Sequence, residues 1–302
     1  MPKAGAGKVW IGISGWTYPP WRKTFYPDKL AQHKELAYAA SIFPSIEING
    51  TFYSLQKPQS FEKWAAETPA DFVFSVKAPR FITHIQKLKE VETPVANFLA
   101  SGILKLGSKL GPILWQLPPS SKYDAQVIET FLRLLPHDLQ AAADQARSHD
   151  KWMDGRAWFK TKEEGPFRHT IEVRNKSFAV PAFVDLLRKY DVALVCADTV
   201  EWPQMMDMTS DFMYCRMHGP EALYEDGYDE KSLDQWTERI AAWARGQEPE
   251  DAQLVTAKTA SKSKGRDVFV YFDNDKKVLS PVNAQGLMKR VDKLLGTTRR
   301  EN

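Results

Sequence analysis

Short runs of hydrophobic residues alternate along the chain with longer segments in which hydrophobic residues recur every three or four positions. The short runs are rich in branched and aromatic residues, as is typical of buried β-strands. We expect such strands at residues 9–13, 46–48, 72–76, 113–117, 169–173, 193–197, 212–215 and 268–272. The longer segments predict helices at residues 30–43, 58–67, 94–110, 125–135, 180–190, 232–245 and 282–295.

Strands that are hydrophobic throughout and alternate with helices are typical of a parallel sheet covered by helices on both faces. Eight such units close into a barrel more readily than they remain an open sheet. The open, doubly wound sheet is the alternative, but it calls for a glycine-rich turn after an early strand. Here Ser14-Gly15-Trp16 follows the first strand, and no Walker-type loop occurs in the chain. The sequence therefore predicts an α/β protein with a TIM-type (β/α)8 barrel.

Two segments fit this alternation poorly. Residues 138–166 carry many charges with little periodicity, and residues 246–264 are rich in Ala, Ser, Thr and Lys. Neither segment has enough hydrophobic residues for a core of its own, so both are expected to be loop excursions between units. We therefore predict a single domain over residues 1–302, with the barrel at about residues 8–295.

The composition, with 43% hydrophobic and 26% charged residues, is that of an ordinary globular protein. Cys196 and Cys215 lie in hydrophobic runs, as buried thiols of a reducing compartment do. No stretch is long and apolar enough to predict a signal peptide or a membrane-spanning helix. We therefore expect a cytoplasmic protein with no membrane contact.

The charge pattern indicates no particular partner. The formal net charge is +3, which is too small to indicate nucleic acid by itself. A basic tract at residues 258–266, with Arg299 and Arg300 near the end of the chain, is expected to be solvated. Phosphate binding by this tract is the alternative interpretation.

Polar side chains stand at the carboxyl end of each predicted strand or in the loop that follows it. In a parallel barrel these positions converge on one mouth. Burying a charge without a partner is costly, so their recurrence favours one shared polar site, although any one position can be polar only because a loop begins there. The candidates for ligand binding are Ser14, Trp16, Asn49, Tyr53, His84, Gln116, Arg174, Arg216, His218, Asp273 and Asn274. Asp198 and Asp275 occupy similar positions.

Glu47 and Glu172 lie inside their strands, in the sequences IEI and IEV. A buried glutamate requires a hydrogen-bonded cation, such as Lys77, Arg174 or Arg216. The two carboxylates are candidates for acid–base chemistry, a glycosidase reaction included, if their surroundings separate their pKa values. Lys77 could form a Schiff base, although an ion pair with Glu47 is its more ordinary role. Glu47, Lys77 and Glu172 are therefore the catalytic candidates.

No metal site is predicted. The chain has six histidines, of which His84 and His218 fall near the expected mouth, whereas multi-zinc barrel hydrolases use several at their strand ends. No GxSxG elbow or dinucleotide-binding fingerprint occurs. The sequence thus indicates no particular cofactor and no oligomeric state.

Aromatic residues gather in the loops after the first three strands. With Lys77, Arg80, Arg174 and Arg216 they could form a surface on which a base or a sugar stacks. Packing of long loops over the barrel is the alternative. These aromatic residues are Trp16, Tyr18, Trp21, Phe25, Tyr26, Phe52, Tyr53 and Phe81.

The predicted strand ends and the loops after them carry sequence motifs. Through these motifs the chain resembles the YecE-like family, the domain of unknown function numbered seventy-two, over about residues 8–290. The motifs are IGISGWTYPPWRKTFYP, IEINGTFYSLQKP, FVFSVKAPRFITH, LGPILWQLPPS, IEVRNKSF, YCRMHG and VFVYFDND. The resemblance implies a TIM-type barrel but no established activity. Members are similar in overall shape to barrel nucleases of the endonuclease IV type, which implies nucleic acid as a partner, although the few histidines argue against a metal-dependent nuclease. Asn175 and Phe178 stand where a histidine and a tryptophan are more usual, and residues 138–166 resemble an insertion.

Three functional hypotheses follow. The first is an enzyme that acts on a small polar or anionic ligand held by Lys77, Arg174 and Arg216. The second is a nucleic-acid-binding or nuclease-like barrel, whose affinity would fall steeply with salt. The third is a non-catalytic scaffold in which the polar residues only compensate one another. The fold does not choose among them, because barrels host many chemistries.

Overall fold

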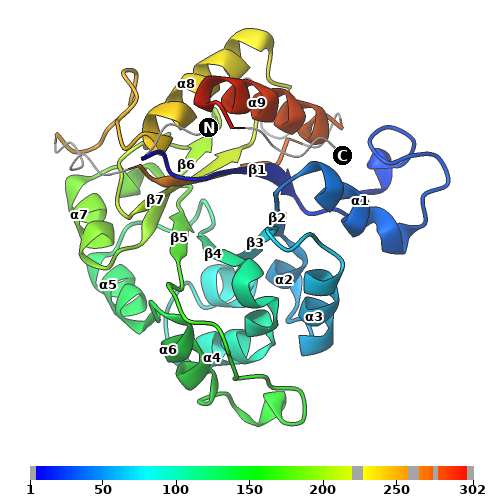
Figure 1. The fold of residues 1–302 in the computed structure, drawn as a ribbon. Coiled ribbons are helices and arrows are strands. Elements are labelled where there is room, and N and C mark those ends of the chain that lie inside the picture. Colours follow the sequence, from blue (N-terminus) through cyan, green and yellow to red (C-terminus); the bar gives the residue numbers. More distant parts are fainter. Residues whose placement is uncertain (1–4, 220–226, 258–264, 275–277, 298–302) are drawn as a thin grey trace. The chain divides into compact units, whose positions relative to one another are not determined.

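The computed structural model describes residues 5–219, 227–257, 265–274 and 278–297. Eight strands form a closed barrel in sequence order (Figure 1). They are β1 (Val9–Ser14), β2 (Ser45–Ile48), β3 (Val73–Lys77), β4 (Leu110–Gln116), β5 (His169–Glu172), β6 (Ala193–Asp198), β7 (Phe212–Met217) and β8 (Asp267–Phe272). Neighbouring strands such as β3 and β4, or β7 and β8, run parallel. The predicted TIM-type α/β barrel is confirmed.

Helices connect successive strands except β6 and β7, which residues 199–211 join without a helix. An α-helix overlaps each range in which one is predicted. The helices are α1 (Glu35–Ile42), α2 (Gly50–Tyr53), α3 (Pro58–Ala66), α4 (Glu92–Ala100), α5 (Ala125–Leu134), α6 (Leu139–Ala146), α7 (Pro181–Lys189), α8 (Glu230–Ala244) and α9 (Ser280–Leu295). The side chain of Asp124 caps α5 by accepting hydrogen bonds from the backbone N–H groups of Gln126 and Val127. None of the helices in the described part of the chain is long and apolar enough to cross a membrane.

The helix expected at residues 94–110 is interrupted by Gly102. Helix α4 ends at Ala100, and a 3-10 segment, Ile103–Lys109, leads into β4. Gly102 has a φ of 110°, and a Cβ atom placed there would lie 2.4 Å from the Cα atom of Pro58. Only glycine fits this left-handed position and this close approach, so the helix cannot continue through it.

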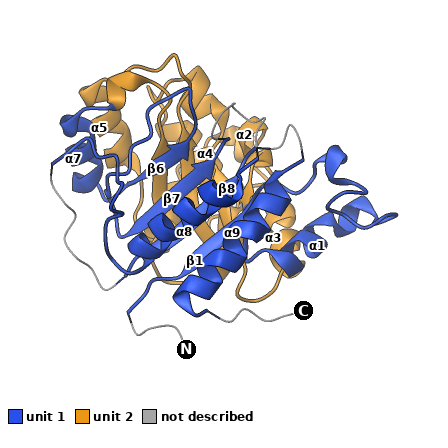
Figure 2. Ribbon diagram, turned by 90° about the horizontal axis from the view of Figure 1, so that it is seen from above, with its two compact units in different colours: residues 1–46, 179–302 blue, residues 47–178 orange. Residues whose placement is uncertain are grey.

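The chain divides into two compact units, residues 1–46 with 179–302 and residues 47–178 (Figure 2). The first unit contains β1 and β6 to β8. Strand β1 pairs with β8 from Val9 opposite Val268 to Ile13 opposite Phe272. Helices α8 and α9 pack against each other, and α9 also packs on β1 and β8 (Figure 1). The single domain expected from the sequence remains a prediction.

Cys196 and Cys215 lie directly opposite each other in the register of β6 and β7. Both are free thiols and fully buried. A hydrogen bond to Cys215, together with burial, raises the pKa of Cys196 well above its ordinary value. The prediction of buried thiols is confirmed, and such a thiol is a poor nucleophile.

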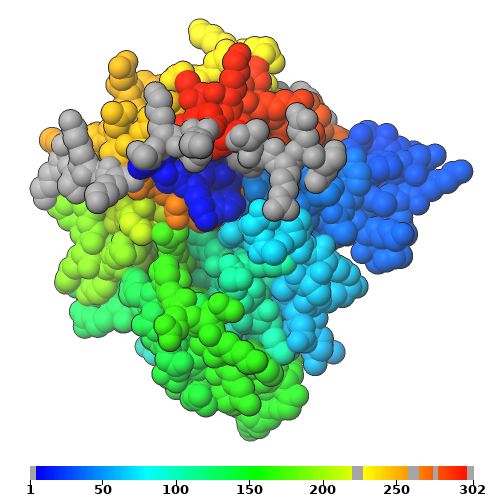
Figure 3. Space-filling view, in the orientation of Figure 1, coloured from blue at the N-terminus to red at the C-terminus, as the bar shows by residue number. Residues whose placement is uncertain are grey.

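The second unit contains β3, β4 and β5, and its core is rich in aromatic side chains. The Trp115 ring of β4 lies 5.9 Å from Phe98 of α4 and 5.0 Å from Phe131 of α5, between ring centroids. Helix α6, which the sequence did not predict, packs against α4. Much of the segment at residues 139–165 lies at the surface that Figure 3 shows, in green, although Ala142, Ala143 and Met153 are buried.

The second expected excursion, residues 246–264, has neither helix nor strand where the structure describes it, over residues 246–257. Parts of the predicted basic tract, the basic chain end and one polar strand end lie outside the described residues: Lys258, Lys262, Lys264, Asp275, Arg299 and Arg300. Arg266, expected to be solvated, is instead 5% exposed, and burial lowers the pKa of its guanidinium.

Candidate functional site

The candidate residues fall into two groups, one in each unit. Residues 47–178 contain Glu47, Asn49, Tyr53, Lys77, His84, Gln116, Glu172 and Arg174. The other unit contains Ser14, Trp16, Arg216, His218, Asp273 and Asn274. In the first group we call Lys77, His84, Gln116, Glu172 and Arg174 the His84 cluster.

Strand ends position three members of the His84 cluster. Lys77, Gln116 and Glu172 are the last residues of β3, β4 and β5. Because these strands are parallel neighbours, their carboxyl ends lie at one edge of the sheet. Gln116 is the register partner of Glu172, so their backbones are adjacent at this edge.

Glu172 is fully buried, and its Oε1 accepts a hydrogen bond from Arg174 Nε at 2.6 Å. The Arg174 side chain is itself only 11% exposed. A buried carboxylate needs a hydrogen-bonded cation of this kind. The expectation that a cation such as Arg174 accompanies Glu172 is confirmed.

His84 follows β3 in a π-helical turn, Phe81–Ile85. Burial, together with the charges of Lys77, Arg174 and Arg80, lowers its pKa to about 4, against a smaller opposite effect of Glu172. The imidazole is therefore neutral near pH 7. Three cations therefore lie near this ring, of which Arg174 is already paired with Glu172.

Lys77 lies over the aromatic ring of Phe52, a contact that was not predicted from the sequence. Its Nζ lies 4.4 Å from the centroid of the Phe52 ring, and the Phe52 ring meets His84 edge-on with centroids 5.0 Å apart. The hydroxyl of Thr51 donates to the Lys77 carbonyl oxygen at 2.6 Å and fixes α2 beside the end of β3. Glu47 is fully buried in β2, and its ion pair with Lys77 stays a prediction.

Gln116 is 5% exposed, and its Oε1 is buried without a hydrogen-bond partner among the residues that the structure describes. Asn49 follows β2, and its Oδ1 atom is likewise buried without a hydrogen-bond partner among the described residues. Buried polar atoms nearly always find a partner in proteins. These two oxygens can accept hydrogen bonds from a bound molecule or from water.

The loop that carries His84 is strained. After the π-helical turn, Lys87, Leu88 and Glu90 adopt positive φ angles of 50°, 65° and 52°. A left-handed conformation is unfavourable for residues with a Cβ atom, and for leucine it is a genuine outlier. Such strain and π-helical turns concentrate at functional sites, which supports a role for this loop.

In the other unit, Arg216 and His218 of the β7 end meet Asp273, which follows β8. Arg216 Nη2 donates to Asp273 Oδ2 at 2.7 Å, and Arg216 Nη1 lies 3.4 Å from His218 Nε2. The other ring nitrogen of His218, Nδ1, faces the same carboxylate. That atom is 3.5 Å from Asp273 Oδ2. Arg216 and His218 are both fully buried.

The side chain of Asn274 forms hydrogen bonds within its own unit. Its side chain accepts a hydrogen bond from Ser280 Oγ at 2.9 Å and donates to Asn283 Oδ1 at 3.0 Å. Asp198 likewise accepts from Trp236 Nε1 and Gln204 Nε2. These contacts join strand ends to α8 and α9, so a polar strand end is not by itself a ligand-binding residue.

Ser14 and Trp16 follow from the end of β1. Ser14 is buried, and Trp16 is half-buried, with its carbonyl oxygen accepting a hydrogen bond from the Tyr26 hydroxyl at 2.5 Å. The part of these two residues in ligand binding stays a prediction. Among the described residues no group of three or more His, Cys, Asp or Glu side chains is placed to hold a metal ion.

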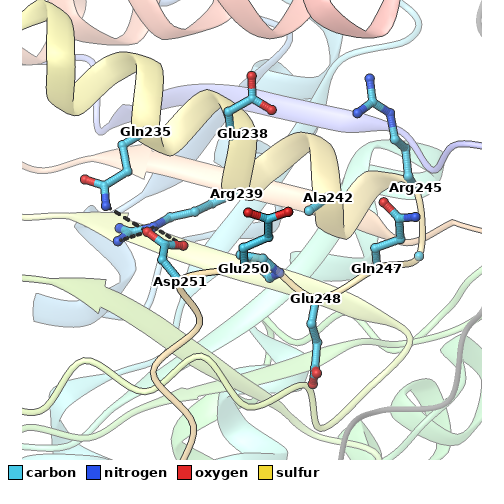
Figure 4. A pocket seen from close by; sticks show the side chains of 11 residues that line it. Gln235, Glu238, Arg239, Ala242, Arg245, Gln247, Glu248, Glu250 and Asp251 are labelled. Carbon is cyan, nitrogen blue, oxygen red and sulfur yellow. Dashed lines mark hydrogen bonds and ion pairs between the residues drawn. The ribbon is translucent and has the colours of Figure 1, made fainter.

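Two cavities include residues that the sequence did not single out. One, of about 870 Å³, lies along α8 and the segment after it (Figure 4). Its central carboxylate, Asp251, pairs with Arg239 at 2.7 Å and accepts a hydrogen bond from Gln235. The other, of about 540 Å³, adjoins the His84 cluster and includes Arg80 and Trp152. Trp152 lies in the excursion at residues 138–166. A large aromatic residue in such a polar segment is the feature of the sequence that could have indicated its part in a cavity.

The sequence is similar to proteins of one family. The family model described as "Protein of unknown function DUF72" matches residues 10–301. The chain is 35% identical to the UPF0759 protein YunF of Bacillus subtilis (strain 168) over 116 residues, 37% of this chain and 40% of that protein. It is 30% identical to the UPF0759 protein YecE of Escherichia coli (strain K12) over 112 residues, 36% of this chain and 38% of that protein. The matched part thus spans about two fifths of these relatives.

Solved structures show the same fold. A DUF72 family protein from Thermotoga maritima MSB8 superposes with a TM-score of 0.70 at 22% identity, covering 94% of this chain and 99% of that one. One from Enterococcus faecalis V583 gives 0.67 at 16% identity, covering 97% of each chain. The family model covers nearly the whole chain, and this protein belongs to the DUF72 family.

Proposed function

We propose that this chain binds a small anionic molecule at the carboxyl ends of β3, β4 and β5, with Lys77 and Arg174 as the anion-binding residues. The observation that carries the proposal is the set of cations around His84. Lys77, Arg174 and Arg80 all act on this imidazole, and Lys77 and Arg174 are largely buried. Cations held at low exposure interact strongly with an anion, because water screens them poorly.

The buried acceptor and donor groups nearby suit a polar ligand. Gln116 Oε1 has no hydrogen-bond partner within the described residues, so it can accept from a hydroxyl or amide of the ligand. The neutral imidazole of His84 has one hydrogen-bond donor and one acceptor, and its Nδ1 already lies 2.9 Å from the Thr83 hydroxyl, which leaves Nε2 for a ligand. A reaction on the bound anion would draw its proton carrier from Glu47, Lys77 or His84, because Glu172 Oε1 is already hydrogen-bonded to Arg174.

The test uses inorganic phosphate and acetate as probes, titrated into the full chain by calorimetry at constant ionic strength near pH 7. We expect wild type to bind at least one of them, and Lys77→Met and Arg174→Met each to weaken binding by about tenfold or more. Lys105→Met is the matched control, since Lys105 also lies over an aromatic ring, with Nζ 3.6 Å from the Trp158 centroid, but outside the His84 cluster. Circular dichroism and the melting temperature establish that each variant is folded.

Two outcomes would contradict the proposal. If wild type binds neither probe at millimolar concentration, the polar strand ends are a structural ion network and the scaffold hypothesis stands. If the control Lys105→Met weakens binding as much as Lys77→Met, the anion is not held by the His84 cluster. A labelled oligonucleotide that binds wild type with steep salt dependence, in the absence of probe binding, would favour the nucleic-acid hypothesis.

A further inference from the structure

A cavity of about 540 Å³ lies beside the His84 cluster, within residues 47–178. We call it the aromatic pocket; its lining includes Phe52, Tyr53, Arg80, Phe81, Asp150 and Trp152. The volume is in the range of pockets that bind small molecules. Its residues come from three separate segments, after β2, after β3 and in the excursion between β4 and β5.

Three large side chains of this pocket are exposed. Tyr53 is 72% exposed, Phe81 51% and Trp152 58%. Exposing aromatic surface forfeits the favourable free energy of burying it, and contiguous exposed patches of this kind mark binding sites. The convergence of three such residues on one cavity indicates that a ligand with apolar surface covers them.

Hydrogen bonds fix the backbone around Trp152, and one cation packs against its ring. Its backbone N–H donates to Asp150 Oδ1 at 2.9 Å, and the Asp150 N–H donates to Asn97 Oδ1 of α4 at 3.0 Å. The Arg156 guanidinium lies 3.9 Å from the Trp152 ring centroid and covers part of the ring. A ring that sits on a fixed backbone and already packs against a cation loses less freedom on binding than a side chain without contacts, so Trp152 suits stacking.

The aromatic pocket and the His84 cluster share two residues. Phe52 lines the pocket, lies beneath the Lys77 ammonium group and touches the His84 ring. Arg80 lines the pocket, and its charge acts on His84. A molecule with its ring in the pocket therefore has its substituents close to the cations of the cluster.

We infer that the ligand is a planar aromatic ring carrying an anionic group, with the ring in the aromatic pocket and the anion on Lys77 and Arg174. This inference rests on the proposed anion site and adds the identity of the rest of the ligand. Planar rings stack on Tyr, Phe and Trp, and an electron-rich ring also attracts the Arg80 guanidinium.

The test compares 1-naphthyl phosphate with inorganic phosphate, so that the ring is the difference between the two probes. In wild type we expect 1-naphthyl phosphate to bind about tenfold tighter or more. Trp152→Ala with Phe81→Ala should reduce this preference to about twofold while leaving phosphate binding unchanged. Trp158→Ala is the control, because this tryptophan lies in the same excursion but does not line the pocket. If the double variant fails to fold, Tyr53→Ser at the most exposed position replaces it and should also reduce the preference.

The outcomes separate this inference from the proposed function. Equal affinity of wild type for the two probes, or a preference that survives the pocket variants, overturns the inference and leaves the anion site standing. Binding of 1-naphthyl phosphate that Lys77→Met does not weaken, but Trp152→Ala with Phe81→Ala abolishes, overturns the anion site and supports the pocket.

Discussion

The indole N–H of Trp115 donates a hydrogen bond to His169 Nδ1 at 3.1 Å, inside the core of the unit formed by residues 47–178. The other ring nitrogen, Nε2, lies 2.7 Å from the Pro136 carbonyl oxygen. Because Nδ1 must accept from the indole, the proton resides on Nε2, which donates to Pro136. The imidazole is thus held in one neutral tautomer. Burial, with a smaller effect of His137, lowers its pKa to about 3 against the hydrogen bond to Pro136.

This arrangement predicts a specific acid sensitivity. His169 and His84 have pKa values lowered to about 3 and about 4, whereas the unfolded chain protonates its histidines near pH 6.5. Between these values the unfolded state binds more protons, so the free energy of unfolding falls as the pH decreases from about 6.5 to about 4. We expect a loss of roughly 1 to 3 kcal/mol for each histidine over this window, measured by urea unfolding at several pH values.

Variants identify the histidines responsible. His84→Gln should remove part of the pH dependence below pH 6.5 while costing little stability near pH 7. His169→Gln should flatten the same dependence but also destabilise the protein near pH 7, because the Trp115 N–H loses its acceptor geometry. His33→Gln, at an exposed position, is the control and should leave the curve unchanged. A pH dependence that persists in both His84→Gln and His169→Gln would show that other groups cause it.

The hydrogen bond between Arg174 and Glu172 predicts strong coupling between the two side chains. Arg174→Met removes the cation from a fully buried carboxylate and should lower the free energy of unfolding by about 2 to 4 kcal/mol. Glu172→Gln keeps the shape and should cost less. A double-mutant cycle by urea unfolding near pH 7 should give a coupling energy of about 1 kcal/mol or more. Additive effects of the two changes would mean that the contact contributes nothing to stability.

In the other unit, Asp273 compensates the fully buried guanidinium of Arg216. Asp273→Asn keeps the side-chain size but removes the charge, so we expect a loss of about 2 to 3 kcal/mol in thermal or urea unfolding. Asp28→Asn, an exposed aspartate in the same unit, should change stability by less than about 0.5 kcal/mol. Equal effects of the two substitutions would show that Asp273 does not neutralise Arg216.

The strands could be predicted because parallel strands buried on both faces are hydrophobic at nearly every position. Helix α6 could not, because its buried positions are Leu139, Ala142, Ala143 and Ala146, and alanine gives little periodic hydrophobic signal. The interruption after α4 was also missed, since it depends on the contact between Gly102 and Pro58, which are 44 positions apart by number.

Residue type and position predicted which polar groups stand at strand ends, but not what they contact. The pairing of Gln116 with Glu172 depends on strand register, which the sequence does not specify. Asn274 has the same position relative to its strand as other candidates, yet Ser280 and Asn283 occupy its side chain. Trp152 contributes to a cavity with Phe52 and Phe81 only because the excursion folds back onto the loops after β2 and β3.

Gly102 allows the two costs of a left-handed glycine to be measured separately. Gly102 and Gly155 both have positive φ angles, of 110° and 72°, but a Cβ atom at Gly155 meets nothing within 4 Å, whereas at Gly102 it lies 2.4 Å from Pro58 Cα. Gly155→Ala should therefore lower the free energy of unfolding by about 1 kcal/mol in urea, because only the left-handed backbone conformation disfavours alanine there. Gly102→Ala adds the steric clash with backbone that must shift, so we expect a loss of about 3 kcal/mol or more. If the two substitutions are equally costly, the contact between Gly102 and Pro58 does not limit the packing of α3 against the segment before β4.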